Sequence, residues 1–199
     1  IAGAVNTVKI NPDKTFKGYN TDAMGFKKAI PSSINLEGAS VALLGTGGAS
    51  RAAVLGLSEL GVKEIGVYTR NIPNALDYMA YMRRKFPAIT FTAYQIDAVR
   101  DLSKYDMLVN TTPIGMLGRS ADMTPVEANV LQTMREGAVV YDVIYNPKKT
   151  VLLTNAERLG LKIINGLDML IYQAISAQEI WLGRTPDFNA MKIAALESL

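Results

Sequence analysis

Short apolar runs alternate along the chain, from Val41 onward, with segments whose apolar residues recur at helical spacing. Apolar runs bounded by polar or glycine-rich residues are typical of buried strands, and the periodic segments between them are typical of helices. The pattern predicts six strands, at residues 40–45, 64–69, 89–94, 106–111, 137–144 and 161–165. It predicts helices at residues 50–60, 74–85 and 151–159, directly after Asn165, and at residues 187–199.

Strands that alternate with helices form right-handed βαβ units, and such units build a parallel sheet that is covered on both faces. Six strands in this rhythm predict an α/β protein with a doubly wound parallel six-stranded sheet, which is the Rossmann-like architecture that binds dinucleotides. The first 36 residues do not follow the rhythm. They predict a pair of strands at residues 4–10 and 15–20, joined by a turn at residues 11–14. A helix is predicted at residues 21–30, with Asp22 in its first turn.

The composition removes several kinds of chemistry. The 199 residues include no cysteine and no histidine, so we expect no disulfide framework, no thiolate or zinc site, and no Ser-His triad. Proton transfer must then use Asp, Glu, Lys or Tyr. The net charge of +3 is spread over mixed acidic and basic residues, which predicts no nucleic-acid partner.

The most apolar long segment, residues 167–182, contains Asp168, Glu179 and two glutamines. It predicts a buried helix, because a span of the bilayer needs about 20 mostly apolar residues. With no signal peptide in the pattern, we expect a cytoplasmic protein without a membrane partner. The sequence leaves the oligomeric state open, a homodimer included.

The first predicted strand runs into a glycine cluster, GTGGAS, at the start of the following helix. The cluster matches the dinucleotide-binding pattern G-x-G-x-x-G at Gly45 and Gly47, and Ser50 stands in place of the third glycine. The first glycine permits the turn, the second lets the backbone approach a pyrophosphate, and the helix N-terminus offers free N–H groups. A glycine-rich turn without a ligand is the alternative. The candidate phosphate-binding residues are Gly45, Thr46, Gly47, Gly48 and Ala49.

The second predicted strand ends in Thr69, Arg70 and Asn71. Proteins that bind NAD carry a carboxylate at this place for the ribose hydroxyls, and none is present here. A cationic side chain there attracts the 2′-phosphate of NADP, and the two polar neighbours add hydrogen bonds. The residues therefore favour NADP over NAD, with an exposed strand-end arginine as the plain alternative.

Six segments stand out along the chain: GAVNTV at Gly3, GYNTDAMGF at Gly18, LLGTGGASRAA at Leu43, VNTTPIGM at Val109, VVYDVIYNP at Val139 and NGLDMLIYQA at Asn165. Together they resemble one family, the shikimate dehydrogenases and their quinate/shikimate relatives. The segments occur in the family's order across nearly the whole chain. The resemblance implies reversible, NADP-linked hydride transfer between 3-dehydroshikimate and shikimate in aromatic amino-acid biosynthesis, the chorismate route.

The resemblance also implies a domain organisation. Residues 37–185 match the NADP-binding domain, and residues 1–36 match the end of a substrate-binding domain that precedes it. Residues 186–199 match a C-terminal helix that returns toward the substrate domain.

Four residues match positions that handle the substrate in the family. Asp22 matches the catalytic aspartate, which works beside a lysine at the reacting carbon's oxygen. On the residues alone, a carboxylate that interacts with the helix dipole is the competing interpretation. Asn6, Tyr145 and Gln173 match substrate-binding positions. The alternative for Asn6 is an asparagine at a strand end that bonds to backbone, and the alternative for Tyr145 is a partly buried aromatic residue. The alternative for Gln173 is a position on a solvated helix face.

Further residues match positions that contact the cofactor. The loop after the fourth predicted strand supplies Thr111, Thr112 and Pro113, at the carboxyl edge where open parallel sheets bind their ligands. Val143 matches a position that touches the nicotinamide through its backbone, and Gly166 matches a cofactor-binding glycine.

The sequence departs from the family pattern in two respects. Asp168 stands where the family usually has glycine, and it either narrows the pocket or caps the helix. The family's catalytic lysine lies in a motif like NVTVPHK, which this sequence lacks, and Lys17, Lys27 and Lys28 are in the wrong context. We therefore expect a fragment of a longer enzyme, or a second polypeptide that supplies the lysine. The chain alone is expected to bind cofactor and to turn over little or no shikimate.

Two alternative functions stay open at this point. One is a quinate/shikimate dehydrogenase that uses NAD or NADP, with Arg70 as evidence against NAD. The other is a non-catalytic nucleotide-sensing homologue, since a fold alone does not fix function. Asp22 and the three substrate-binding matches argue against a sensor, which needs no pocket for a polyol acid.

Overall fold

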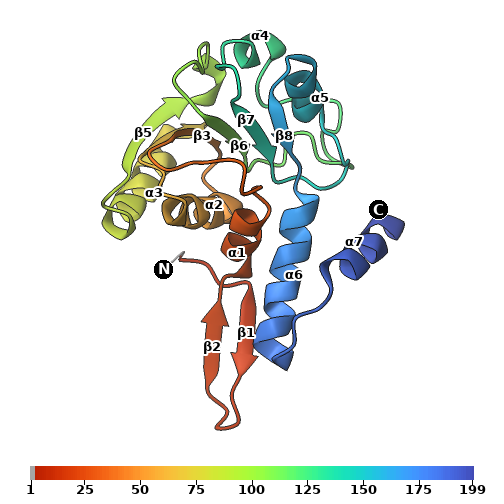
Figure 1. Cartoon of the computed structure of the whole chain (residues 1–199). Coiled ribbons are helices and arrows are strands. Elements are labelled where there is room, and N and C mark those ends of the chain that lie inside the picture. The colour runs from red at the N-terminus through yellow and green to blue at the C-terminus, as the bar shows by residue number, and fades with distance from the viewer. Residues whose placement is uncertain (1–2) are drawn as a thin grey trace.

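The apolar runs form the six strands of one parallel sheet, as the sequence predicts. The computed structural model describes residues 3–199, and Figure 1 shows the sheet at the centre of its larger part. The strands are slightly shorter than predicted in the second half of the chain. Their bounds are β3 Ser40–Leu44, β4 Glu64–Thr69, β5 Thr90–Gln95, β6 Met107–Asn110, β7 Val139–Asp142 and β8 Lys162–Ile164.

The predicted helices are present, and two of them begin two residues earlier than the pattern indicates. The second starts before its proline because Asn71 caps it, accepting a hydrogen bond from the N–H of Asn74. A short helix, α4, and one 3₁₀ turn, η1, are not predicted. The helices are α1 Thr21–Lys28, α2 Gly48–Glu59, α3 Ile72–Lys85, α4 Ala128–Leu131, α5 Val151–Arg158, α6 Leu167–Leu182 and α7 Phe188–Glu197, with η1 at Ile96–Ala98.

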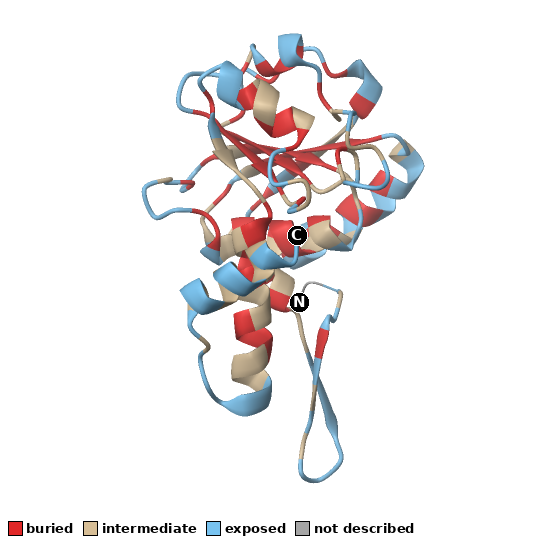
Figure 2. Cartoon of the chain, turned by 90° about the vertical axis from the view of Figure 1, so that its right-hand side faces the viewer, coloured by how far each residue is buried: buried red, intermediate tan, exposed pale blue. Residues whose placement is uncertain are grey.

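Both faces of the sheet are buried, as Figure 2 shows, because successive strand residues point to opposite sides. In β3, Val41 and Leu43 pack against α1, α2, α3 and α6, while Ala42 and Leu44 pack against the side that α4 and α5 cover. This two-sided burial explains why the strands are continuous apolar runs instead of alternating ones. The doubly wound prediction is confirmed.

The strand order is β5-β4-β3-β6-β7-β8. The chain moves outward from β3 to β5 and then returns to the other side of β3 to continue through β8. The order therefore reverses between β3 and β6, and the loops that follow these two strands diverge at their carboxyl ends. Open parallel sheets bind their ligands at such a switch point.

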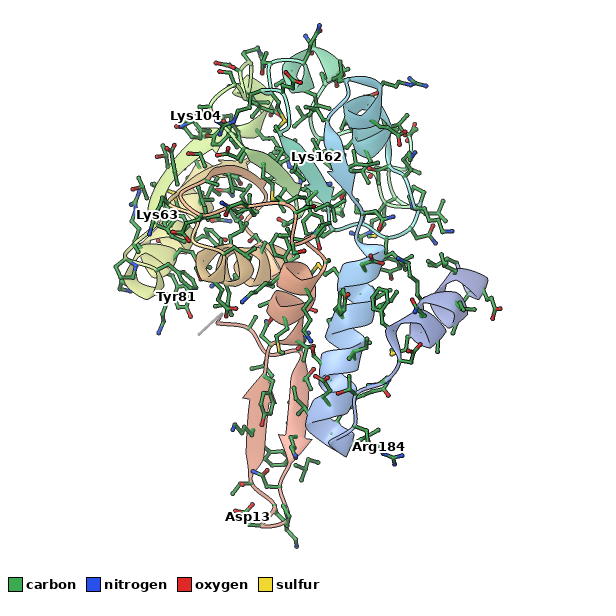
Figure 3. All side chains as sticks on the ribbon, viewed as in Figure 1. Asp13, Lys63, Tyr81, Lys104, Lys162 and Arg184 are labelled. Carbon is green, nitrogen blue, oxygen red and sulfur yellow. The ribbon has the colours of Figure 1, made fainter. Side chains whose placement is uncertain are left out.

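The other part of the molecule extends away from the sheet (Figure 1). Its antiparallel hairpin consists of β1 Thr7–Ile10 and β2 Phe16–Tyr19. The side chain of Trp181 on α6 donates a hydrogen bond of 3.0 Å to the carbonyl of Val8 and so holds the hairpin beside this helix. Figure 3 shows the far end of this part, where Asp13 lies at the hairpin tip and Arg184 follows α6.

Helix α1 fits between α2 and α6 because a glycine lies at each contact. A Cβ atom on Gly25 would lie 2.5 Å from the carbonyl oxygen of Met169, and one on Gly56 would lie 2.8 Å from the Phe26 ring. Both distances are shorter than side-chain carbons tolerate. These two glycines set how closely the hairpin part approaches the sheet part. In residues 3–199, none of the helices combines the length and the apolar character that crossing a membrane requires.

A carboxylate is buried at the end of β7. Asp142 is fully inaccessible to solvent and accepts hydrogen bonds from Thr150, Ile144 and Asn110. Burial raises the pKa of the Asp142 carboxyl to about 6, and the three hydrogen bonds oppose that shift. The folded state therefore holds this proton more tightly than the unfolded state does.

Replacement of Gly25 by alanine is expected to lower the free energy of unfolding by about 2 kcal/mol, because the added methyl group forces α1 away from α6. The loss exceeds the gain in helix propensity, which is about 1 kcal/mol. Urea unfolding measures it. Gly48→Ala is the matched control, since a Cβ at Gly48 would meet nothing within 4 Å. Equal stability of the Gly25 and Gly48 variants would contradict the packing argument.

The raised pKa of Asp142 predicts that the contribution of this residue to the free energy of unfolding falls as the pH rises. The carboxyl ionises near its ordinary pKa of 3.8 in the unfolded state and only near about 6 in the folded state. The free energy of unfolding of the protein, relative to that of its Asp142→Asn variant, therefore falls by about 3 kcal/mol as the pH rises across that interval. Urea unfolding of both proteins between about pH 4 and about pH 7 measures the difference. Parallel pH profiles for the two proteins would show that Asp142 does not titrate in this way.

Candidate active site

The turn after β3 requires glycine at its first position. Gly45 has a φ of +101°, which L side chains rarely adopt, and a Cβ there would lie 3.0 Å from Oγ1 of Thr111. Its N–H donates to the carbonyl of Tyr68 at 2.9 Å. The turn is thereby held between the ends of β4 and β6, at the switch point of the sheet.

The N-terminus of α2 has free space above it. Gly47 is the N-cap and provides no side-chain hydrogen bond, and a Cβ on Gly47 or Gly48 would meet nothing within 4 Å. Ser50, in place of the third glycine, is buried and donates from Oγ to the carbonyl of Gly47 at 2.6 Å. The serine therefore tightens the turn instead of filling the space. The exposed N–H groups and the helix dipole suit an anion such as a pyrophosphate.

The end of β4 places one cation beside this turn. Arg70 is exposed, and Thr69 is buried with its Oγ1 accepting the N–H of Asn71 at 3.2 Å. Arg70 and the glycine turn line one cavity of about 270 Å³, together with Thr46 and the loop that follows β6. Among the described residues that line it, Arg70 is the charged one and no carboxylate is present. The cavity has the charge that a 2′-phosphate needs.

A second cavity, of about 490 Å³, lies over the ends of β6 and β7. Thr111, Thr112 and Pro113 form one side of it, and Val143 and Tyr145 form another. The backbone of Gly166 lies directly behind this loop. Its N–H donates to the carbonyl of Ile144 at 3.0 Å, and a Cβ at this position would clash with the carbonyl oxygen of Val143. The loops that the sequence assigns to the cofactor are therefore neighbours in space.

Asn6, Asp22 and Gln173 come together around a residue that the sequence pattern does not single out. Thr21 is fully buried; its N–H donates to Oδ1 of Asn6 at 2.9 Å, and its Oγ1 lies 3.4 Å from Oε1 of Gln173. Asn20 caps α1 by accepting from the N–H of Ala23 at 3.0 Å. The signal for Thr21 is its place in NTD, between a capping residue and the candidate acid.

The pKa of the Asp22 carboxyl is raised by burial, and a hydrogen bond from Asn6 partly opposes the shift. Asp22 is half-buried, so it stays in contact with solvent or a ligand. A carboxyl with a raised pKa can both hold and release a proton near neutral pH more readily than an exposed one.

The structure separates other candidates from this group. Tyr145 is 40% exposed and lines the second cavity, and in residues 3–199 no hydrogen bond joins it to Asn6, Asp22 or Gln173. Lys27 pairs with Glu59 at 3.0 Å. The ammonium groups of Lys17 and Lys28 lie over the rings of Tyr19 and Tyr172, respectively.

Asp168 does not act as a side-chain cap of α6. It lies in the first turn of that helix, whose N-cap, Gly166, is without a side-chain hydrogen bond. Its carboxylate pairs with Lys192 of α7 at 2.6 Å, and both residues line a separate cavity that is also bordered by β8 and α5. Asp168, where the sequence departs from the family pattern, thus links α6 to α7 through this ion pair.

The chain matches known proteins both in sequence and in fold. Residues 166–196 match the family model of the shikimate 5′-dehydrogenase C-terminal domain. The shikimate dehydrogenase (NADP(+)) of Bacillus cereus strain B4264 is 39% identical over 199 residues, which cover 99% of this chain and 69% of that protein.

Two solved structures have the same fold. A shikimate dehydrogenase in complex with NADP⁺ superposes with a TM-score of 0.86 at 35% identity, over 99% of this chain and 67% of that one. The quinate dehydrogenase of Corynebacterium glutamicum in complex with NAD gives a TM-score of 0.88 at 29% identity, over 98% of this chain and 68% of that one. On the identity and the coverage together, the chain belongs to the shikimate dehydrogenase family.

Proposed function

We propose that this protein is an NADP-dependent shikimate dehydrogenase, an oxidoreductase that interconverts 3-dehydroshikimate and shikimate. The observation that carries the proposal is the arrangement along α6. Gly166 at the start of this helix contacts Val143 in the loop that lines the second cavity, and Gln173 approaches Thr21 beside Asp22. The two contacts are seven residues apart, about 10 Å along the helix axis. One helix therefore connects the cofactor cavity to the candidate acid.

The cofactor-binding residues follow the order of the strands. The pyrophosphate is proposed to bind the N–H groups that follow Gly45 at the start of α2, with Thr46 and Ala49 beside it. The 2′-phosphate binds Arg70 with help from Thr69 and Asn71. Since β4 lies on one side of β3, the nicotinamide half extends to the other side, over β6 and β7. There it meets Thr111, Thr112, Pro113, the backbone of Val143 and Gly166.

Asp22 is proposed to move the proton. NADP, when bound, supplies or accepts the hydride in this family. The half-buried carboxyl of Asp22, with its raised pKa, exchanges the proton at the oxygen of the reacting carbon. Asn6 and Gln173 hold hydroxyl groups of the substrate on either side, with Tyr145 at the far edge of the cavity.

We further propose that residues 1–36 and α7 belong to the substrate-binding domain, and residues 37–185 to the cofactor-binding domain. The hairpin stands away from the sheet (Figure 1), and its large apolar side chains are exposed, whereas a finished domain buries most of its own. Those side chains are Val5, Val8, Ile10 and Phe16, with Ile193 on α7. A second copy of the chain is the other candidate to cover these side chains. Sedimentation of the protein distinguishes the two cases. The cytoplasm is the proposed location.

Quinate is the second candidate substrate, and the relative that acts on it was solved with NAD. Arg70 favours the first candidate, because NAD has no 2′-phosphate for the guanidinium to bind. A purely sensing role does not explain why Asn6 and Gln173 both meet Thr21, directly beside Asp22.

The cofactor proposal predicts that Arg70→Gln weakens NADP⁺ binding by about 10- to 100-fold, because the 2′-phosphate loses a charge-assisted hydrogen bond. NAD⁺ binding is expected to change less than about twofold. Calorimetry on this chain measures both. Arg84→Gln removes the same charge from an exposed position on α3 and is the matched control. Tighter binding of NAD⁺ than of NADP⁺ by the unaltered protein would refute the proposal.

The catalytic proposal predicts that Asp22→Asn, made in an intact protein that oxidises shikimate, lowers kcat for this reaction by about 10²- to 10⁴-fold. The Kd for NADP⁺ stays unchanged, because Asp22 is not among the residues proposed to bind the cofactor. Absorbance of the reduced cofactor follows the rate. Asp13→Asn, at the hairpin tip, is the control and keeps full activity (Figure 3). If the Asp22 variant kept full activity too, Asp22 would not be the catalytic acid.

A further inference from the structure

Two buried polar residues lie side by side at the ends of β6 and β7. Asn110 and Asp142 are register partners in the parallel pair, and both are fully inaccessible to solvent. Each is the last residue of its strand, so each precedes one of the two loops that line the 490 Å³ cavity. Neither residue lines the cavity itself, and any effect on a ligand must pass through the loops.

Asp142 holds the loop that follows β7. Its Oδ1 accepts the N–H of Ile144 at 3.1 Å, next to the backbone of Val143. Its Oδ2 accepts the hydroxyl of Thr150 at 2.7 Å, and Thr150 is the N-cap of α5. The loop between β7 and α5 is thus fastened near its beginning and at its end to one carboxylate.

Asn110 holds the loop that follows β6, and Asp142 sets the orientation of its amide. The Nδ2 group of Asn110 donates to Oδ1 of Asp142 at 3.0 Å. Its Oδ1 then faces the other way and accepts both the N–H of Thr112 at 3.0 Å and the hydroxyl of Thr112 at 2.7 Å. An amide turned by 180° would place its NH₂ group against two donors. The acceptor at residue 142 therefore determines which way the Asn110 side chain points.

We propose that Asp142 is a positioning residue, which sets the separation of the loops after β6 and β7 and thereby the fit of the nicotinamide half of the cofactor between them. The inference rests on the proposed function for the location of that half, and it assigns a role to a residue outside the proposed binding set. A carboxylate suits the role because it only accepts hydrogen bonds, and here it faces three donors.

The effect is confined to one end of the cofactor. Thr111, the first residue of the loop after β6, has its own anchor, since its N–H and its hydroxyl both donate to the carbonyl of Leu44, at 3.0 and 2.6 Å. The hydrogen bonds that the Asp142 carboxylate accepts come from Asn110, Ile144 and Thr150, and not from the glycine turn or Arg70. The adenosine half should therefore bind normally when Asp142 is changed.

The experiment compares two probes on this chain, NADP⁺ and 2′,5′-ADP, which lacks the nicotinamide half. In Asp142→Ala, the Kd for NADP⁺ is expected to rise about tenfold, because three donors lose their acceptor and the loops separate. The Kd for 2′,5′-ADP should change less than about threefold. Asp142→Asn keeps an acceptor for Asn110 and Ile144, and it should restore NADP⁺ binding to within about threefold of the unaltered protein.

Met82→Ala is the control for general loss of stability, since Met82 is buried in the core under α3, an element that adjoins neither loop. It should lower the melting temperature and leave both affinities unchanged. If Asp142→Ala does not fold, Asn110→Ala breaks the same link from the other strand and should show the same selective loss of NADP⁺ binding.

Three results would overturn the proposal: unchanged NADP⁺ affinity in a folded alanine variant, equal losses for NADP⁺ and 2′,5′-ADP, or failure of Asp142→Asn to restore binding. Failure of the proposed function looks different, because the unaltered protein would then bind neither probe.

Discussion

The close approach of β3 and β6 at their carboxyl ends is the constraint on which the cofactor region depends. The carbonyl of Leu44 accepts two hydrogen bonds from Thr111, and the next residue along the chain, Gly45, has no space for a side chain. With the turn fixed in this way, α2 begins directly above the switch point and its first N–H groups face open space. A bulkier turn would displace the helix N-terminus from the edge of the sheet at which a dinucleotide can extend toward both β4 and β7.

Contacts of a similar kind connect the sheet to the candidate acid. Gly25, Gly56 and Gly166 each lie where a Cβ would meet backbone or ring atoms, and together they bring α1 against α2 and α6, and α6 against the loop after β7. These contacts are backbone approaches, so they leave little freedom for the helices to slide. The position of Asp22 relative to the cofactor cavity is therefore set by the packing of helices and not by a flexible loop.

The sequence predicts the sheet well because its strands are buried on both faces, and short apolar runs between helical segments are typical of such strands. Helix boundaries are predicted less well where a capping side chain decides them. The proline at position 73 suggests that the helix begins after it, whereas the Asn71 cap makes α3 begin at Ile72. In the site, the glycine cluster and Arg70 stand at strand ends that periodicity can find. Thr21, Asn110 and Asp142 could not be found in this way, because their importance lies in partners that are distant in the sequence or on a neighbouring strand.

The polar groups of the candidate site divide into those that are open to solvent and those that hold other groups in place, and burial separates the two. Arg70 and Tyr145 are exposed and Asp22 is half-buried, so each can exchange protein or solvent contacts for contacts to a ligand. Asn110 and Asp142 are fully buried, and they hydrogen-bond to each other and to the loops that follow their strands. A buried carboxylate is costly to keep, as the raised pKa of Asp142 shows, and a stable sheet would not need one at this position. Its cost is understandable where two loops must be held at a fixed distance from each other, which is what a cofactor bound between them requires.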